Sequence, residues 1–128
     1  MTVPKEGKIL IIEDEVSLLN ILTDKLTREG FLVVQAKNGE EGLEVALREH
    51  PDLMLLDIIM PKMDGIAMLK ELQQDEWGKN AKVIIFSNLS ENEKIDKALG
   101  SGSYEYLIKA DWKIGDVVTK IRKILSKL

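Results

Sequence analysis

Five short apolar segments are spread along the chain, and after each of them apolar residues recur at helical spacing. Runs this short are typical of strands that are buried on both faces, because such strands need no polar alternation. Strands that alternate with amphipathic helices predict an α/β fold, a doubly wound parallel sheet with helices on both faces. The predicted strands are Lys8–Ile12, Phe31–Ala36, Leu53–Leu56, Lys82–Phe86 and Tyr104–Ile108.

The intervening segments predict five helices and no linker. Asp64 and Ser90 have the side chains of helix N-caps, and Asn38-Gly39 is typical of a turn. The last strand alternates polar and apolar residues, which indicates an edge strand. With no internal repeat, we expect one domain over residues 1–128, with a core from about 8 to 127. The predicted helices are Ser17–Glu29, Glu40–Glu49, Asp64 to about Gln74, Ser90 to about Gly100, and a last helix lined by residues from Ile114 to Leu128.

The composition excludes several classes of protein. The chain has 128 residues, a net charge of -4 and a pI of about 5.1, which argues against a nucleic-acid surface. It contains no cysteine, so disulfides and thiolate metal sites are excluded. No apolar run has the roughly 18 residues of a membrane span, and the first residues lack the apolar segment of a signal peptide. We therefore expect a cytoplasmic protein with no membrane contact.

Each predicted strand on one side of the sheet is followed by polar residues. Asp57 is the clearest case, because it interrupts the apolar run "LMLLDIIMPKMDG". Since the carboxyl ends of parallel strands meet at one rim, ligands bind there. We therefore expect Asp57 to cap a core strand and face a cluster, without being buried in the core. The residues expected at this rim are Glu13, Asp14, Asp57, Ser87, Asn88 and Lys109.

The charges at this rim favour a hard cation. Three carboxylates give -3 and Lys109 gives +1, so a divalent ion brings the formal sum to zero. Crowded carboxylates repel one another unless a cation joins them, and oxygen ligands favour Mg²⁺. Such a site can bind a phosphoryl group, and a carboxylate beside the metal can act as a nucleophile that forms an aspartyl phosphate.

These residues, in this order and at these spacings, resemble the receiver domain of two-component response regulators over about Lys8 to Lys127. The resemblance implies a flavodoxin-like sheet of strand order 2-1-3-4-5 and an aspartate that accepts phosphate from a histidine kinase or phosphotransfer protein. Carried over, Asp57 is the phosphoacceptor. The implied Mg²⁺ ligands are Glu13, Asp14, Asp57 and the backbone carbonyl of Ile59. The implied phosphoryl-binding and switch residues are Ser87, Lys109 and Tyr106.

Four positions vary the family pattern. Ala110 follows Lys109 where the family usually has proline, and Ser87 stands in place of the commoner threonine. Asn88 replaces a smaller residue, and Ile59 stands where polar residues are frequent. In the family, side chains that flank the site control the access of the hydrolytic water. The implied gating residues are Ile59, Asn88 and Leu89, and their bulk predicts a long-lived aspartyl phosphate.

The resemblance also implies the partners. A downstream protein is expected to read the phosphorylation through the face formed by residues of about 91–127, with the chain a monomer or a phosphorylation-dependent dimer. The protein would not be an enzyme, beyond catalysing its own phosphorylation and dephosphorylation. Alternatives are a Mg²⁺-dependent phosphatase with an aspartyl nucleophile, a flavodoxin-like cofactor binder and a docking module that is not phosphorylated. Tyr106 is equally consistent with a packed aromatic residue on an edge strand.

Overall fold

The computed structural model describes residues 7–58, 60, 62–87, 95, 97, 104–108 and 113–126. Five parallel strands form one sheet in the order β2-β1-β3-β4-β5, which confirms the expected flavodoxin-like topology. The strands are β1 (Lys8–Ile12), β2 (Leu32–Ala36), β3 (Leu53–Asp57), β4 (Val83–Ser87) and β5 (Glu105–Ile108). The helices are α1 (Val16–Arg28), α2 (Gly39–Glu49), α3 (Gly65–Leu72), α5 (Ile114–Leu125) and the short 3₁₀ helix η1 (Gly78–Asn80).

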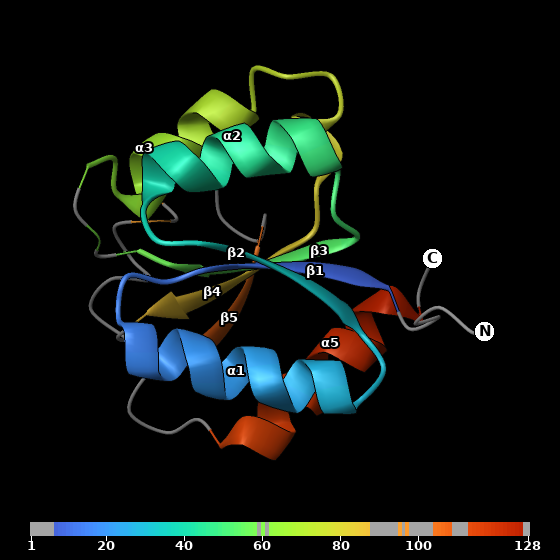
Figure 1. Cartoon of the computed structure of the whole chain (residues 1–128). Coiled ribbons are helices and arrows are strands. Elements are labelled where there is room, and N and C mark those ends of the chain that lie inside the picture. Colours follow the sequence, from blue (N-terminus) through green and yellow to red (C-terminus); the bar gives the residue numbers. More distant parts are fainter. Residues whose placement is uncertain are drawn as a thin grey trace.

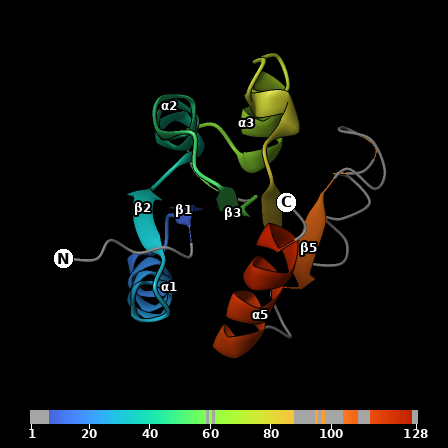
Figure 2. The same ribbon diagram turned by 90° about the vertical axis from the view of Figure 1, so that its right-hand side faces the viewer.

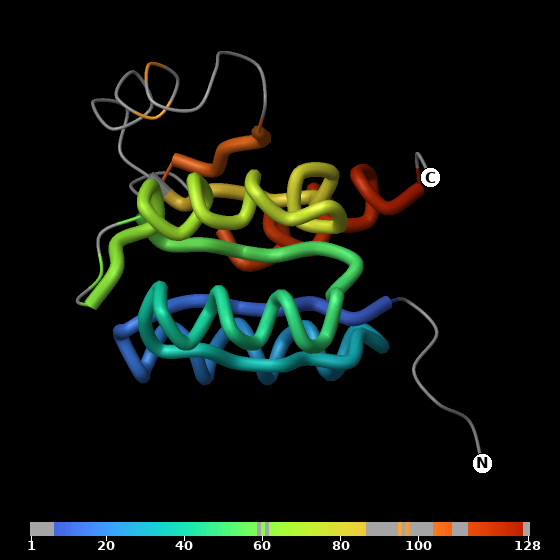
Figure 3. Tube along the Cα trace, turned by 90° about the horizontal axis from the view of Figure 1, so that it is seen from above, coloured from blue at the N-terminus to red at the C-terminus, as the bar shows by residue number. Residues whose placement is uncertain are grey.

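The helices cover both faces of the sheet. Helices α2 and α3 lie on one face, and α1 and α5 lie on the other (Figures 1 and 2). Seen from above, α2 and α3 run side by side (Figure 3), and they are in contact. This arrangement follows from the right-handed crossover that joins parallel strands, which places successive helices on alternate faces when the strand order reverses.

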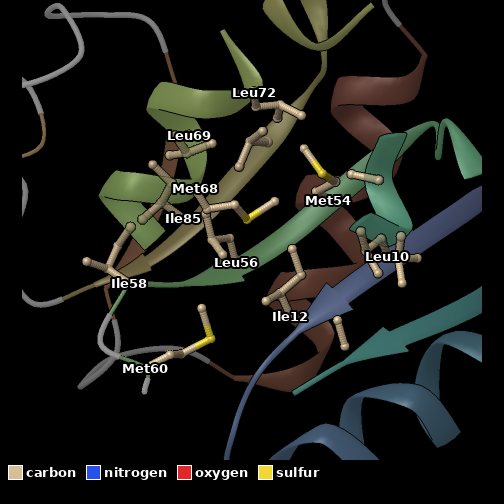
Figure 4. Close-up of a cluster of buried hydrophobic side chains, with 14 of the residues drawn as sticks. Leu10, Ile12, Met54, Leu56, Ile58, Met60, Met68, Leu69, Leu72 and Ile85 are labelled. Atoms are coloured by element: carbon tan, nitrogen blue, oxygen red, sulfur yellow. The ribbon is translucent and has the colours of Figure 1, made fainter. Parts of the chain in front are cut away.

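Two apolar clusters hold the layers together, one on each face of the sheet. Beneath α2 and α3, the upper cluster joins β1, β3 and β4 through residues that include Leu10, Leu56 and Ile85, all fully buried. Figure 4 shows that Ile58 and Met60 extend this cluster past the end of β3. The lower cluster contains Ile11, Leu55 and Phe86 and packs against α1 and α5. Consecutive strand residues therefore enter opposite clusters, as the pleat requires.

The end of α5 is fastened to the end of α1 by Arg122. Its guanidinium group forms an ion pair of 3.1 Å with Glu29, donates a hydrogen bond of 3.0 Å to the Glu29 carbonyl, and lies 5.6 Å from the centre of the Phe31 ring. A hydrogen bond and charge from Lys25, followed by those of Arg122, lower the pKa of Glu29. A lowered carboxyl pKa contributes stability at neutral pH, which is lost as the pH falls through that pKa.

The predicted elements are confirmed, with shifts of one to three residues at their ends. One local prediction was wrong: Asn38-Gly39 is not a turn, because Asn38 is the N-cap of α2 and Gly39 is its first residue. The Asn38 side chain accepts a hydrogen bond of 2.8 Å from the Glu41 N–H. Asp64 caps α3 as predicted, with its side chain accepting a hydrogen bond of 2.9 Å from the Ala67 N–H.

Four α-helices lie within the described residues, and the fifth predicted helix, from Ser90 to about Gly100, falls mostly outside them. Within that segment the structure describes Ile95 and Lys97, and both have helical backbone conformation. Ile95 is fully buried and belongs to the upper cluster.

Candidate functional site

The carboxyl ends of the strands meet at one rim of the sheet, as the sequence predicts. In the strand register, Ile12 pairs with Leu56, the next residue Asp57 pairs with Phe86, and Ser87 pairs with Ile108. The residues that end or follow β1, β3, β4 and β5 are therefore adjacent across the sheet. Because β1 and β3 are neighbours, the acidic residues of both strands converge on one point.

Glu13 is held at this rim from both sides. Its backbone N–H donates a hydrogen bond of 3.0 Å to the carbonyl of Ala36, which continues the ladder between β1 and β2. One of its carboxylate oxygens accepts a hydrogen bond of 3.0 Å from the N–H of Glu15, the residue before α1. Glu13 is only 2% exposed. The side chain thus shapes the turn that leads from β1 into α1 and has a fixed position.

Asp57 is the last residue of β3 and is 3% exposed. The expectation that it is not buried in the core is therefore wrong, although it does face the acidic cluster. Its neighbours Ile58 and Met60 are also buried and belong to the upper apolar cluster. A carboxylate in such surroundings is costly unless polar or charged groups compensate it.

Glu13, Asp14 and Asp57 form a cluster that can hold a metal ion. One carboxylate oxygen from each residue lies within 4.8 Å of the others. Two of the three side chains are almost fully buried and Asp14 is exposed, so the cluster opens to solvent on one side. Three oxygen ligands with an open side suit a hard divalent cation that keeps some of its waters, and Mg²⁺ has this preference. The residues therefore fit the metal that the sequence implies.

Several predicted site residues lie outside the described part of the chain. They are Ile59, Asn88, Leu89 and Lys109. Ser87 ends β4, with its backbone paired to β5. The predicted roles of these residues remain predictions.

Tyr106 lies in the middle of β5, in register with Ile85 of β4. It is half-buried and packs against the upper apolar cluster, next to which lies Tyr104. The Tyr104 hydroxyl accepts a hydrogen bond of 3.1 Å from the side chain of Gln73, which follows α3. Both tyrosines thus point to the α3 side of the sheet, and Tyr106 has the packing of the aromatic residue that was the simpler interpretation.

Sequence analysis missed a contact between α2 and the segment that follows Asp57. The missing side chain of Gly39 makes room for the backbone carbonyl of Met63. Lys62 and Met63 have positive φ angles of 57° and 94°, which residues with a Cβ atom rarely adopt. The sequence carries one signal for this contact, a glycine in the first turn of a helix, but it does not say which residue approaches that glycine.

Among the described residues, no helix has both the length and the apolar character that crossing a lipid bilayer requires.

The family model of the response regulator receiver domain matches residues 9–122 of the chain. The match begins within β1 and ends within α5, so it includes all five strands and the acidic cluster.

Curated relatives and solved structures agree with this match. The chain is 35% identical over 122 residues to the alkaline phosphatase synthesis transcriptional regulatory protein PhoP of Bacillus subtilis, covering 94% of this chain and 49% of PhoP. It is 32% identical to sporulation initiation phosphotransferase F of the same organism, covering 92% and 93% of the two chains. The response regulator TrrA of Thermotoga maritima, solved in complex with Mg²⁺-BeF, superposes with a TM-score of 0.76 at 30% identity over 91% of this chain and 97% of TrrA. The chain spans about half the length of PhoP and of the ycf27 regulators that it also matches.

Proposed function

This chain belongs to the response regulator receiver domain family, and from that premise we propose that it is a phosphoacceptor switch in which Asp57 receives the phosphoryl group. The observation that carries the proposal is the convergence of Glu13, Asp14 and Asp57, with carboxylate oxygens within 4.8 Å of one another. The donor is a phosphohistidine of a kinase or phosphotransfer protein, and the metal is Mg²⁺.

The proposed reaction is a transfer between two side chains. A carboxylate oxygen of Asp57 forms a bond to phosphorus while the bond from phosphorus to the histidine nitrogen breaks, which leaves an acyl phosphate and a neutral imidazole. Burial of Asp57 keeps bulk water away from one side of this carboxylate. When bound, Mg²⁺ supplies positive charge against the oxygens of the transferred group. The chain promotes its own phosphorylation and dephosphorylation in this way and turns over no separate substrate.

Each remaining site residue has a distinct proposed role. Glu13 and Asp14 bind the metal together with Asp57 and the Ile59 carbonyl. Lys109 directly follows β5 and is proposed to form a charge-assisted contact with the phosphoryl oxygens. Ser87 is proposed to donate a hydrogen bond to the same group.

The proposed function is tested by incubating the protein with acetyl phosphate and Mg²⁺ and measuring its intact mass. We expect the mass of one added phosphoryl group, and we expect no addition when a chelator removes the metal. Absence of the adduct at every Mg²⁺ concentration would reject the proposal. Equal labelling with and without metal would reject the role given to the acidic cluster.

The aspartyl phosphate is expected to be long-lived, and Ile59→Asn is expected to shorten its lifetime. An isoleucine side chain cannot orient a water molecule for attack on phosphorus, whereas an asparagine amide can donate and accept hydrogen bonds. Loss of the phosphoryl adduct with time, followed by intact mass after removal of acetyl phosphate, measures this lifetime. Ile59→Leu is the matched apolar control. A lifetime in Ile59→Asn equal to that of the control would show that position 59 does not control hydrolysis.

Output is proposed to occur through the face of about residues 91–127, with Tyr106 as the residue that transmits the change. Tyr106 lies two residues before the end of β5 and packs against the upper cluster, so a movement of β4 at the rim would reach it. Exposed charges on this face include Glu105, which forms an ion pair of 3.2 Å with Lys120. A face with charges of both signs suits a protein partner whose binding depends on salt.

Beryllofluoride, a phosphoryl mimic, is expected to shift amide resonances of β5 and α5 as well as those near Asp57. The reason is that Ser87 and Tyr106 are proposed to move together as a two-state element. Tyr106→Leu keeps an apolar side chain but removes the ring, and it should confine the shifts to the rim. Shifts confined to the rim in the unmodified protein would contradict transmission by this path.

A further inference from the structure

The N-terminus of α2 touches the loop that leaves the phosphoacceptor strand, and we propose that Gly39 is a positioning residue for the Asp57 site. Its missing side chain lets Met63 approach, and this contact fixes the segment that leads from Asp57 into α3. The inference rests on the proposed function, because the site that Gly39 would position is the Mg²⁺ and phosphoryl site.

The geometry leaves no room for a larger residue at position 39. A Cβ atom there would overlap the carbonyl oxygen of Met63 and lie 2.8 Å from the carbonyl carbon and 3.2 Å from the Met63 Cβ atom. Two of these three atoms belong to the backbone, which cannot rotate away as a flexible side chain can. The requirement for glycine is therefore one of space between two segments.

The α2 side of this contact is fixed in place. Asn38 caps the helix through a hydrogen bond of 2.8 Å from Glu41, and the Glu41 side chain accepts a hydrogen bond of 2.9 Å from the N–H of Lys37. This reciprocal capping holds the first turn of α2 to the chain that precedes it. Gly42, one turn further along α2, packs closely against Ile12 of β1. A methyl group at position 39 would thus move the loop and not the helix.

The loop side of the contact is strained and held at both ends. Met63 has a φ of 94° and Lys62 a φ of 57°, and such conformations persist when their surroundings enforce them. At one end the Gly65 N–H donates a hydrogen bond of 2.8 Å to the carbonyl of Ile58. At the other, Asp64 caps α3. The carbonyl of Met63 lies between these anchors and meets α2, which closes the loop against the helix.

A displaced loop would reach the site through few bonds. Ile58 follows Asp57 directly and its carbonyl is bonded to Gly65, so a shift at Met63 is transmitted to the backbone of the phosphoacceptor strand. Gly65 is itself closely packed, because a Cβ atom there would lie 2.9 Å from the Cα atom of Ile58 and 3.1 Å from the Asp57 carbonyl oxygen. The two glycines therefore leave the loop one position.

The test compares Gly39→Ala with two alanine controls in the intact chain. Gly78→Ala would also overlap a backbone carbonyl, that of Leu72, but Gly78 lies in η1 before β4, at the opposite end of the sheet from the rim. Gly115→Ala has no neighbouring atom within 4 Å and reports the effect of the substitution alone. Mg²⁺ affinity is measured by calorimetric titration, and amide resonances of the loop are recorded in metal-free protein.

We expect Gly39→Ala to weaken Mg²⁺ affinity about tenfold, the scale seen when a residue that orients metal ligands is changed. The amide resonances of Asp57, Ile58 and Asp64 should shift in the metal-free variant. Both controls should keep the affinity and the resonances of the unmodified protein. Adding Met63→Gly to Gly39→Ala should restore most of the affinity, because glycine at position 63 lets the loop backbone move aside.

Two results would overturn the inference: unchanged affinity with unchanged loop resonances in Gly39→Ala, or an equal loss of affinity in Gly78→Ala. If Gly39→Ala does not fold, Met63→Gly alone decides, since a loosened loop should bind Mg²⁺ several times more weakly without unfolding, and unchanged affinity would reject the role. If the unmodified protein binds no Mg²⁺, the proposed function fails, while the loop resonances still test the contact.

Discussion

Asp57→Ala is expected to abolish phosphorylation by acetyl phosphate, leaving a single unmodified mass. Asp57 is the one carboxylate of the cluster that belongs to a strand, and its burial gives it a fixed position at the rim. Removing the nucleophile leaves nothing to form the acyl phosphate, so the expected loss is complete. Intact mass after incubation with acetyl phosphate and Mg²⁺ measures it.

The matched control is Asp24→Ala on α1. Asp24 is exposed and pairs with Arg28 at 3.1 Å on the helix surface, away from the cluster. Its replacement should leave labelling at the level of the unmodified protein. Full labelling of Asp57→Ala would place the acceptor on another residue, and peptide mapping of the adduct would then locate it.

Asp14→Ala is expected to weaken Mg²⁺ binding by at least about tenfold while the protein remains folded. Asp14 is the exposed member of the cluster, so its side chain leaves no cavity, and one of the three converging carboxylates is lost. A ligand that binds the native state raises the melting temperature. Mg²⁺ should therefore raise the melting temperature of the unmodified protein, and the same concentration should have little effect on the variant.

Glu15→Ala is the control for this prediction. Glu15 is adjacent in sequence, carries the same charge and is exposed, but it lies outside the cluster and its side chain forms no capping hydrogen bond with α1. Its loss should leave the Mg²⁺-induced rise in melting temperature in place. An equal reduction in Glu15→Ala and Asp14→Ala would mean that Mg²⁺ responds to the overall negative charge of this end of the sheet and is not coordinated by specific carboxylates.

Sequence alone determined the architecture, because it is encoded by local patterns. Continuous apolar runs such as Lys8–Ile12 can only be buried between two layers, and the polar alternation around Tyr106 indicated the edge position that β5 occupies. The convergence of Glu13, Asp14 and Asp57 was also predictable, since parallel strands bring their carboxyl ends to one rim. Both inferences need only the order of residues along the chain.

The tertiary structure decided what depends on contact between distant segments. Asp57 is buried because Ile58 and Met60 continue the apolar cluster past the strand, and the cap formed by Asp64 then turns the chain back over them. Gly39 is required because a carbonyl from residue 63 comes to lie against it, 24 positions further along the chain. No local pattern marks such an approach. Periodicity records which face of an element is apolar, whereas close packing between two backbones is settled only when the layers come together.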